Sequence, residues 1–448
     1  MLQSSKTEGL LDILRRSSES IFSQLSKAPY TLPEATNDLS IKSLLLSLLT
    51  SAAKSSTSET TECIKSKTTD FILCFAALAS ASDSTYDQLS WIPGSLSASA
   101  GSDAFKELAD AYYDAFDGGE ELMKVGEFEL DLKFLSKETR LVIEFMPRIF
   151  PLLKDNIKES SIGTADDISA ASARVPVAYA IVAAHQLRWV VTQVDYPYLG
   201  KLVHLVIPCA LTALDHWSPQ VKGQGMISFI HLAKNVNAAE IGWYEDVILD
   251  ACCQNIASSE EIWQYVVEMS VLLVTFTQRS NPRSQWYEKL INEMLNHLER
   301  QPRNQERRVV WLKHIEPLFN SLGLILVAHF RRIFPLFFRW MHADDDDTVI
   351  LVLKRIKTIL RLTWVRNSPY TERLVDELVT LHKEAALRIS REDIRALILD
   401  ILRLIQQSKG SHFEALWNKH KEDPDLTTFH ELFTRKDSAV VQCLSSAS

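Results

Sequence analysis

The sequence predicts an all-α protein, a HEAT- or armadillo-like solenoid of antiparallel helix pairs. Three observations support this class: the chain has 448 residues, it contains 13 glycines, and its apolar residues recur at three- and four-residue steps. A chain of this length exceeds one compact core, so it must form several domains or an array built unit by unit. Strand-rich and nucleotide-cradling folds need glycine at their turns, so the shortage of glycine favours helices.

Helix-period segments follow one another from about residue 196 to residue 407, with short breaks between them. Over residues 198–214 the apolar positions share one helix face. A break follows in which Ser218 is placed to cap a second helix and Pro219 suits the first turn of that helix. This pattern predicts an antiparallel helix pair.

The pair recurs at an interval typical of HEAT and armadillo units. First helices are expected near residues 197, 240, 283, 323 and 370, which are 43, 43, 40 and 47 residues apart. Second helices are expected over residues 219–235, 260–278, 305–321, 348–364 and 391–407. Each pair leaves an apolar side that only a neighbouring pair can cover, so we expect the pairs to stack.

Four regions are expected along the chain. An irregular N-terminal helical region covers residues 1–160, HEAT-like repeats cover 174–410, a C-terminal helical cap covers 411–436, and a frayed tail covers 437–448. Two connections rich in serine and alanine, residues 95–102 and 160–173, are expected to be exposed loops.

Cysteine usage and hydropathy indicate a cytoplasmic or nuclear protein. The six cysteines form no C-x-x-C pair and most lie in apolar surroundings, so we expect them to be buried and reduced. The N-terminus lacks the layout of a secretory signal. Apolar runs at residues 71–81 and 322–341 are too short, or too interrupted by arginine, to span a bilayer comfortably, and we expect no membrane partner.

The sequence predicts no enzyme activity, no cofactor and no metal site. It contains no phosphate-binding glycine loop or G-x-S-x-G element, and no H-E-x-x-H motif accompanies His185, His204, His216 or His231. The acidic run at residues 344–347 lacks the spacing of a calcium loop. It lies where a helix is expected to start, so capping explains it better than cation binding.

A basic segment interrupts this acidic chain, whose net charge is −9. Residues 279–366 contain 16 Lys and Arg against nine Asp and Glu. The segment can be the solvated face of ordinary helices, or a ridge that binds an acidic protein patch or nucleic acid. In a helix, Trp311, Ile333 and Phe334 would face the core while the neighbouring arginines point outward.

The residues nominated for partner binding are the arginines of this ridge and two aromatic residues that a terminal helical segment could expose. They are Arg307, Arg308, Arg331, Arg332, Arg339, Trp417 and Phe429.

One stretch resembles a known family. Residues 203–225 read VHLVIPCALTALDHWSPQVKGQG, and FIHL at 229–232 and IGWYEDVILD at 241–250 follow. This stretch looks like a HEAT unit and resembles, more narrowly, the Tti-two subunit family of the Triple-T (Tel-two/Tti-one/Tti-two) co-chaperone complex. The spacing of Asp215, Val221 and Lys222 is shared by HEAT proteins generally.

The resemblance implies a helical, non-catalytic protein that binds Tti-one-like and Tel-two-like helical repeat proteins. With them it would help newly made phosphatidylinositol-kinase-related protein kinases mature with the ninety-kilodalton heat-shock chaperone. A protein-binding scaffold is therefore the leading hypothesis. The alternatives are a transport or assembly adaptor of the HEAT/armadillo class and, less favoured, a nucleic-acid-binding helical repeat.

Overall fold

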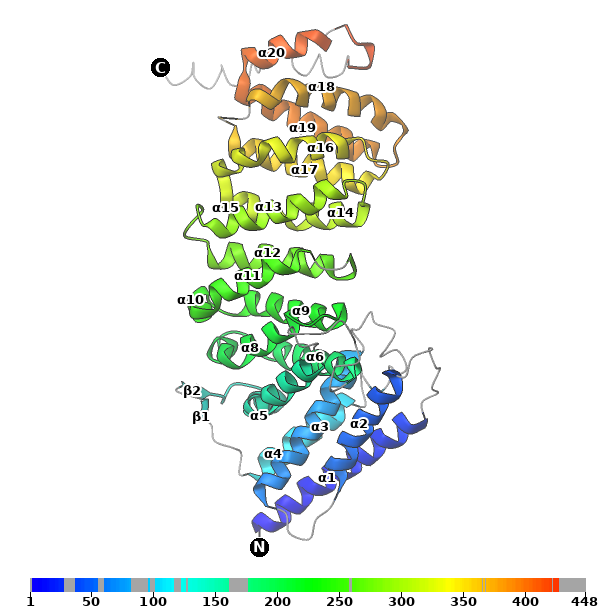
Figure 1. Ribbon diagram of the computed structural model, residues 1–448, viewed down its shortest axis with the longest axis vertical. Coiled ribbons are helices and arrows are strands. Elements are labelled where there is room, and N and C mark those ends of the chain that lie inside the picture. Colours follow the sequence, from blue (N-terminus) through cyan, green and yellow to red (C-terminus); the bar gives the residue numbers. More distant parts are fainter. Residues whose placement is uncertain are drawn as a thin grey trace, which may run out of the picture. The chain divides into compact units, whose positions relative to one another are not determined.

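A computed structural model describes residues 2–27, 37–54, 60–81, 96, 101–116, 122–125, 128–160, 176–257, 260–364, 366, 368–420 and 422–426. These residues are almost entirely helical (Figure 1), which confirms the predicted all-α class. The chain forms two compact units: unit 1 is Met1–Met269 and unit 2 is Ser270–Ser448. Residues 161–175 and the predicted tail lie outside the described residues.

Unit 1 contains an N-terminal group of long helices and a series of stacked helix pairs. Helices α1 to α4 pack on one another, and α3 also packs on α6. The elements of unit 1 are α1 (Leu2–Lys27), α2 (Asn37–Ala53), α3 (Thr61–Ala81), α4 (Gly101–Ala115), β1 (Leu122–Val125), β2 (Phe128–Asp131), α5 (Lys137–Glu159), α6 (Val177–Thr192), α7 (Tyr198–Lys201), α8 (Val203–Leu214), α9 (Pro219–Asn235), α10 (Ala238–Ile241), the 3₁₀ helix η4 (Gly242–Tyr244), α11 (Glu245–Asn255), η5 (Glu260–Ile262) and α12 (Trp263–Thr277), which crosses the unit boundary.

A short antiparallel hairpin lies between α4 and α5. Strands β1 and β2 pair in the register Leu122 to Asp131 and Val125 to Phe128. These strands were not predicted from the sequence, because four residues are too few to display a period-two pattern.

The helix pairs of unit 1 form two layers. In each pair we call the first helix A and the second helix B. A helix α5 packs on A helix α8, and B helix α6 packs on B helix α9. Within the second pair α9 lies against α8 at Gly225, where an added Cβ atom would lie 3.0 Å from the Cβ of Ala213. The stacked pairs of unit 1 thus include α5, which the sequence pattern placed in the N-terminal region.

Buried polar contacts join α3 to α6. The Gln186 side chain donates to the Leu73 carbonyl at 2.8 Å, and the Ser80 hydroxyl donates to the His185 carbonyl at 2.8 Å. Arg188 donates to the Ser80 carbonyl at 3.1 Å. Burial, with a smaller effect of the Arg188 charge, lowers the pKa of His185 to about 3, so this imidazole is neutral in the fold.

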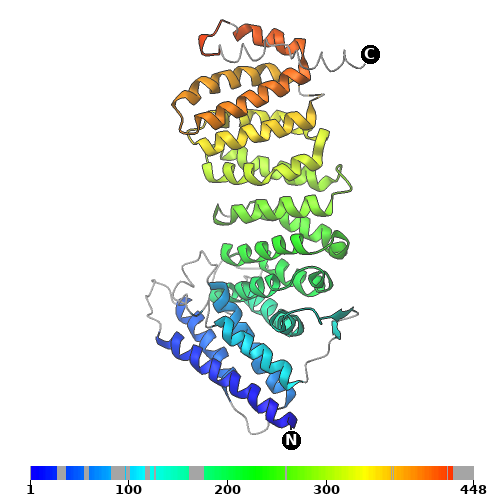
Figure 2. The same cartoon turned by 180° about the vertical axis from the view of Figure 1, so that it is seen from behind.

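Unit 2 consists of stacked pairs followed by a short terminal helix. The A helices α13, α16 and α18 contact one another in order, and the B helices α14, α17 and α19 do the same. Figure 2 shows these helices from behind. Beyond α12 the elements are α13 (Gln285–Arg300), α14 (Gln305–His314), α15 (Glu316–Leu322), η6 (Gly323–His329), α16 (Phe330–Met341), α17 (Asp346–Thr363), α18 (Ser368–Glu384), η7 (Ala385–Leu387), α19 (Arg391–Lys409), α20 (Ser411–Trp417), η8 (Asn418–His420) and η9 (Pro424–Leu426).

Aromatic side chains fill the core of unit 2. Trp311 of α14 makes edge contacts with Phe319, Phe337 and Trp340 at centroid distances of 5.9, 6.3 and 6.1 Å. These arrangements are favourable for aromatic rings. The prediction that Trp311, Ile333 and Phe334 face the core is confirmed, because all three are fully buried.

The predicted second helices fall on α9, η5 with α12, α14 with α15, α17 and α19, and their ends differ by no more than two residues. Ser218 does occupy the N-cap of α9 and Pro219 its first turn. The Ser218 side chain does not cap the helix, however. Its hydroxyl donates to Gln220 at 3.1 Å, while its amide donates to Nδ1 of His216 at 3.0 Å.

One helical stretch of the described chain, Glu316–Met341, has the length and apolar composition needed to cross a membrane. It is divided into α15, η6 and α16, and half of its most apolar window is buried within the structure. Packing in unit 2 therefore accounts for part of its apolar character.

Candidate docking surface

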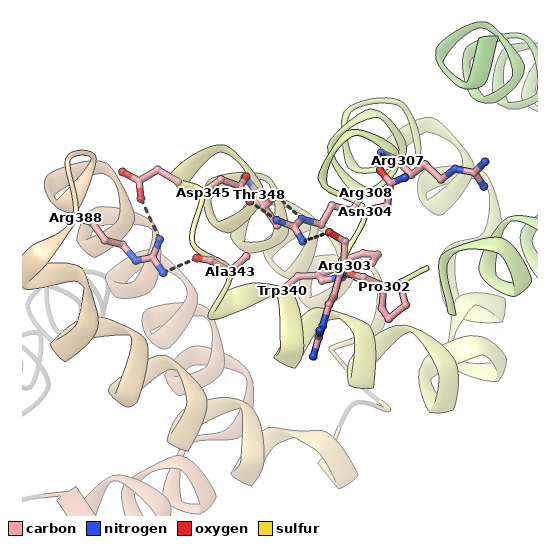
Figure 3. Close-up of polar contacts among 11 residues, drawn as sticks. Pro302, Arg303, Asn304, Arg307, Arg308, Trp340, Ala343, Asp345, Thr348 and Arg388 are labelled. Atoms are coloured by element: carbon pink, nitrogen blue, oxygen red, sulfur yellow. Dashed lines mark hydrogen bonds and ion pairs between the residues drawn. The ribbon is translucent and has the colours of Figure 1, made fainter. Parts of the chain in front are cut away.

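The turns that join A to B helices in unit 2 lie along one edge of the stack. They comprise residues 301–304, 342–345 and 388–390. Figure 3 shows that arginine side chains reach from one of these turns to the next. We call the contacts made by Arg308 and Arg388 the arginine clamps.

The first clamp is Arg308, in the first turn of α14. Its Nε donates to the Thr348 hydroxyl at 2.9 Å, and its Nη2 pairs with Asp345. Asp345 is also the N-cap of α17 and accepts the Thr348 amide at 2.8 Å. Burial alone would raise the pKa of Asp345, but hydrogen bonds from Thr348 and Arg308 lower it. The expectation that the acidic run caps a helix is confirmed.

The second clamp is Arg388, which connects the last turn to the one before it. Its Nη1 donates to Asp346 at 3.0 Å and its Nη2 donates to the Ala343 carbonyl at 2.7 Å. The other oxygen of Asp346 accepts the Ser390 amide at 2.8 Å. This amide and the Arg388 guanidinium lower the pKa of Asp346.

The Arg388 clamp lies between two exposed aliphatic residues. Arg388 follows η7 with extended backbone (φ −92°, ψ 153°), and its side chain turns inward to Asp346 and the Ala343 carbonyl. Leu387 and Ile389, on either side of it, are 95% and 100% exposed. Two large aliphatic residues are therefore displayed on an anchored turn.

These turns line two neighbouring grooves. The first, which we call the acidic groove, has a volume of about 830 Å³ and is lined by His342, Asp344, Asp345, Asp346, Asp347, Glu384, Leu387, Arg388, Ile389 and Ser390. The second, the arginine groove, has a volume of about 730 Å³ and is lined by Arg303, Gln305, Arg308, Arg339, Trp340, His342, Ala343, Asp344 and Asp345. The two grooves share His342, Asp344 and Asp345, so together they form one surface.

His342 lies between two carboxylates at this surface. Its Nδ1 is 2.7 Å from Glu384 and its Nε2 is 2.9 Å from Glu377. Burial alone would lower the pKa of His342, but the hydrogen bonds to Glu384 and Glu377 raise it above its usual value. The histidine therefore joins A helix α16 to A helix α18 most strongly when it is protonated.

Two of the nominated arginines do not point into solvent as predicted. Arg307 is only 7% exposed, and its Nη1 lies 3.4 Å from Nδ1 of His297 on α13. In Figure 3 its guanidinium points away from that of Arg308. Arg308 is engaged in the first clamp. The prediction of outward-facing side chains is wrong at both positions, because each arginine serves contacts between helices.

Of the three nominated arginines of α16, one is bound to another helix and two are exposed. Arg332 is bound to α13, where it donates to Glu299 at 2.7 Å, to Asn296 at 2.7 Å and to Asn292 at 3.0 Å. Arg331 and Arg339 are exposed. Arg339 lines the arginine groove, so it belongs to the candidate surface.

The two aromatic residues nominated near the C-terminus do not contribute an exposed patch among the described residues. Trp417 is 6% exposed and stacks on Phe413 at a centroid distance of 5.8 Å. The expectation that it is exposed is wrong, because α20 packs on α18 and α19. Phe429 lies outside the described residues.

The most exposed apolar residues of the described chain were not predicted from the sequence. Leu387 and Ile389 were not nominated, nor was Trp243, which is fully exposed in unit 1. Trp243 follows Gly242, whose φ of +38° turns the chain between α10 and α11. The available signal is an apolar residue beside a glycine or a charged residue in a turn between two helices.

Among the residues that the structure describes, no group of three or more His, Cys, Asp or Glu side chains could hold a metal ion. None of the five described cysteines forms a disulfide, and all except Cys63 are buried. The sixth, Cys443, lies outside the described residues.

Comparison with known sequences finds one extensive and several weaker similarities. No family model matches the chain. The uncharacterized protein At2g39910 of Arabidopsis thaliana is 55% identical over 418 residues, which cover 93% of this chain and 92% of the relative. TELO2-interacting protein 2 of Homo sapiens is 22% identical over 255 residues, or 52% of this chain. The matched region covers 50% of the length of the human relative.

Two solved structures of similar architecture are those of Kap95p, determined with RanGDP, and Kap121p. They match with TM-scores of 0.46 and 0.44 at 10% and 9% identity, over 90% and 91% of this chain. The matches cover 50% and 47% of the lengths of those proteins. Both TM-scores are below 0.5, and the repeat architecture stands on the helices and contacts described above.

Proposed function

Because the chain belongs to the same family as the uncharacterized protein At2g39910 of Arabidopsis thaliana, and resembles TELO2-interacting protein 2 more weakly, we propose that it is a non-catalytic scaffold of a co-chaperone complex. In this role it binds a Tel-two-like and a Tti-one-like helical repeat protein. The complex supports the maturation of phosphatidylinositol-kinase-related protein kinases with the ninety-kilodalton heat-shock chaperone.

The observation that carries this proposal is the similarity to a protein whose name states that it interacts with TELO2, over half of this chain. The architecture supports it. Stacked helix pairs offer long edges of turns on which another elongated protein can dock. The edge of unit 2 combines exposed aliphatic side chains with charged side chains at fixed positions, as in the centre and rim of protein interfaces.

Affinity purification from cells tests the proposal. The tagged full-length chain is expressed at its native level, and co-purifying proteins are identified and quantified by mass spectrometry against a tag-only control. We expect Tel-two-like and Tti-one-like chains in near-stoichiometric amounts, with large kinases and the heat-shock chaperone in smaller amounts. Depleting the protein is expected to lower the amounts of those kinases without lowering their messenger RNA.

Other outcomes would point to the alternatives. Nuclear pore proteins or transport cargo, in place of the expected subunits, would replace the proposal with a transport adaptor. Retention on RNA or DNA that falls steeply with salt would favour a nucleic-acid-binding repeat. The ion pairs of unit 2 speak against the latter, because they bind Arg308, Arg332 and Arg388 to carboxylates within the unit.

A further inference from the structure

We propose that the acidic groove of unit 2 binds a short segment of a partner protein that carries aliphatic side chains flanked by lysine or arginine. This inference rests on the proposed scaffold function and adds to it the place and chemistry of one contact. None of the arginines nominated from the sequence lines the acidic groove, although Arg339 lines the neighbouring arginine groove.

Exposed aliphatic residues indicate the apolar part of the ligand. Leu387 and Ile389 are 95% and 100% exposed and lie on one rim of the groove. Covering exposed aliphatic side chains with another molecule removes apolar surface from water, which favours binding. Single exposed apolar residues are common on protein surfaces, but here two of them border one hollow.

The turn that carries this pair is held in place before any ligand arrives. Arg388 between them is fixed by Asp346 and the Ala343 carbonyl, and the next residue but one is fixed through the Ser390 amide. A preorganised turn loses little conformational entropy on binding, so more of the contact free energy appears as affinity.

Unpaired carboxylates indicate the charge of the ligand. Four consecutive aspartates and Glu384 line the groove. Asp345 pairs with Arg308, Asp346 with Arg388, and Glu384 with His342. Asp344 and Asp347 are exposed, and neither has a side-chain partner among the described residues. Their negative charge attracts Lys or Arg and repels phosphate groups, which excludes nucleic acid and anionic lipid from this groove.

A peptide titration tests the groove directly on the full-length chain. The probe is a fluorescein-labelled peptide, Gly-Ser-Lys-Lys-Leu-Gly-Leu-Lys-Lys-Gly-Ser, measured by fluorescence anisotropy. Two matched peptides replace its lysines with glutamate or its leucines with serine. We expect the probe to bind at least about tenfold more tightly than either matched peptide. Raising the ionic strength from about 0.05 M to about 0.3 M should weaken its binding.

Two groove variants and one control locate the binding. The double variants Leu387→Ser/Ile389→Ser and Asp344→Lys/Asp347→Lys should each bind the probe at least about tenfold more weakly. The control, Glu288→Lys/Leu324→Ser, makes the same kinds of change at exposed residues of α13 and η6, away from the A–B turns, and should bind as the parent does. Circular dichroism spectra show that each variant is folded, and either groove variant alone suffices.

The outcomes separate this inference from the proposed function. Equal affinity for the lysine and glutamate peptides, absence of saturable binding, or groove variants that bind like the parent would each overturn the groove assignment. If the parent recovers Tel-two-like protein from cells and both groove variants recover it equally, the groove is not the contact although the scaffold role stands. If the peptide binds as expected but no such subunit is recovered, the proposed function fails and the groove remains.

Discussion

Cutting the Arg388 clamp tests whether the A–B turns of unit 2 are held by charge-assisted hydrogen bonds. Oδ1 of Asp346 and Nη1 of Arg388 are 3.0 Å apart, and the two side chains are only 19% and 13% exposed. Asp346→Ala removes this bond and the acceptor of the Ser390 amide, and Arg388→Ala removes the bond to the Ala343 carbonyl as well. Both variants leave the apolar core unchanged.

The expected loss follows from the number and kind of bonds. Hydrogen bonds to charged groups contribute about 1.5–3 kcal/mol each, and the partial exposure of this pair places it at the lower end. We expect each single variant, which loses two of the three bonds, to lower the free energy of local opening by about 3 kcal/mol, and the double variant, which loses all three, by about 4.5 kcal/mol. The coupling energy of the pair is then about 1.5 kcal/mol.

Native-state hydrogen exchange measures this locally, which matters because a chain of two units need not unfold in one step. Amides of residues 343–347 and 388–391 should exchange about a hundredfold faster in each single variant. Asp344→Ala is the control, since this exposed neighbour takes part in neither clamp, and its effect should stay within about 0.5 kcal/mol. A coupling energy near zero, or equal effects of Asp344→Ala and Asp346→Ala, would refute the clamp.

Three further predictions concern pH and packing. The pKa of His185 is lowered to about 3 from about 6.5, so folding stability should fall as the pH drops below about 6.5. The loss should be about 2 kcal/mol by pH 5, and His185→Leu should abolish this pH-dependent loss in urea titrations. The pKa of His342 is raised, so its stabilising effect is complete below its unfolded-state pKa and is lost as pH rises through the folded one; His342→Gln should therefore destabilise the protein at pH 6 and have less effect at pH 8.5, and the reverse order would contradict the assignment. Gly225→Leu should lower the thermal unfolding midpoint by the equivalent of about 1–3 kcal/mol because α9 touches Ala213, whereas Gly9→Ala, with open space around it, should not lower it.

The helix pairs could be predicted from the sequence because their signals are local. Pro219 after Ser218, and the apolar stripe of residues 349–360, specify helix starts and faces without reference to the rest of the chain. The hairpin β1–β2 was missed because each strand is too short to show alternation. The α3–α6 contact was not foreseen, since Ser80 and His185 are 105 residues apart.

The candidate surface was harder to predict, because the exposure and the partners of an arginine side chain depend on which helix lies beside it. Arg307 and Arg308 are neighbours in sequence, yet one is buried against α13 and the other clamps α17. Periodicity places a residue on a helix face but does not say whether that face meets water or another helix. Leu387 and Ile389 were overlooked because a turn residue has no periodic pattern to signal its exposure.

The sequence separations of these bonds have a consequence for the order of folding during synthesis. Arg308 and Asp345 are 37 residues apart, and Arg388 and Asp346 are 42 apart, so each clamp closes a loop of one repeat. Unit 2 can therefore acquire structure one repeat at a time as the ribosome releases it. The polar contacts of α3 cannot form until residues 185–188 have been synthesised. Until α6 emerges, the apolar residues of α3 that it covers stay exposed and can be bound by cellular chaperones.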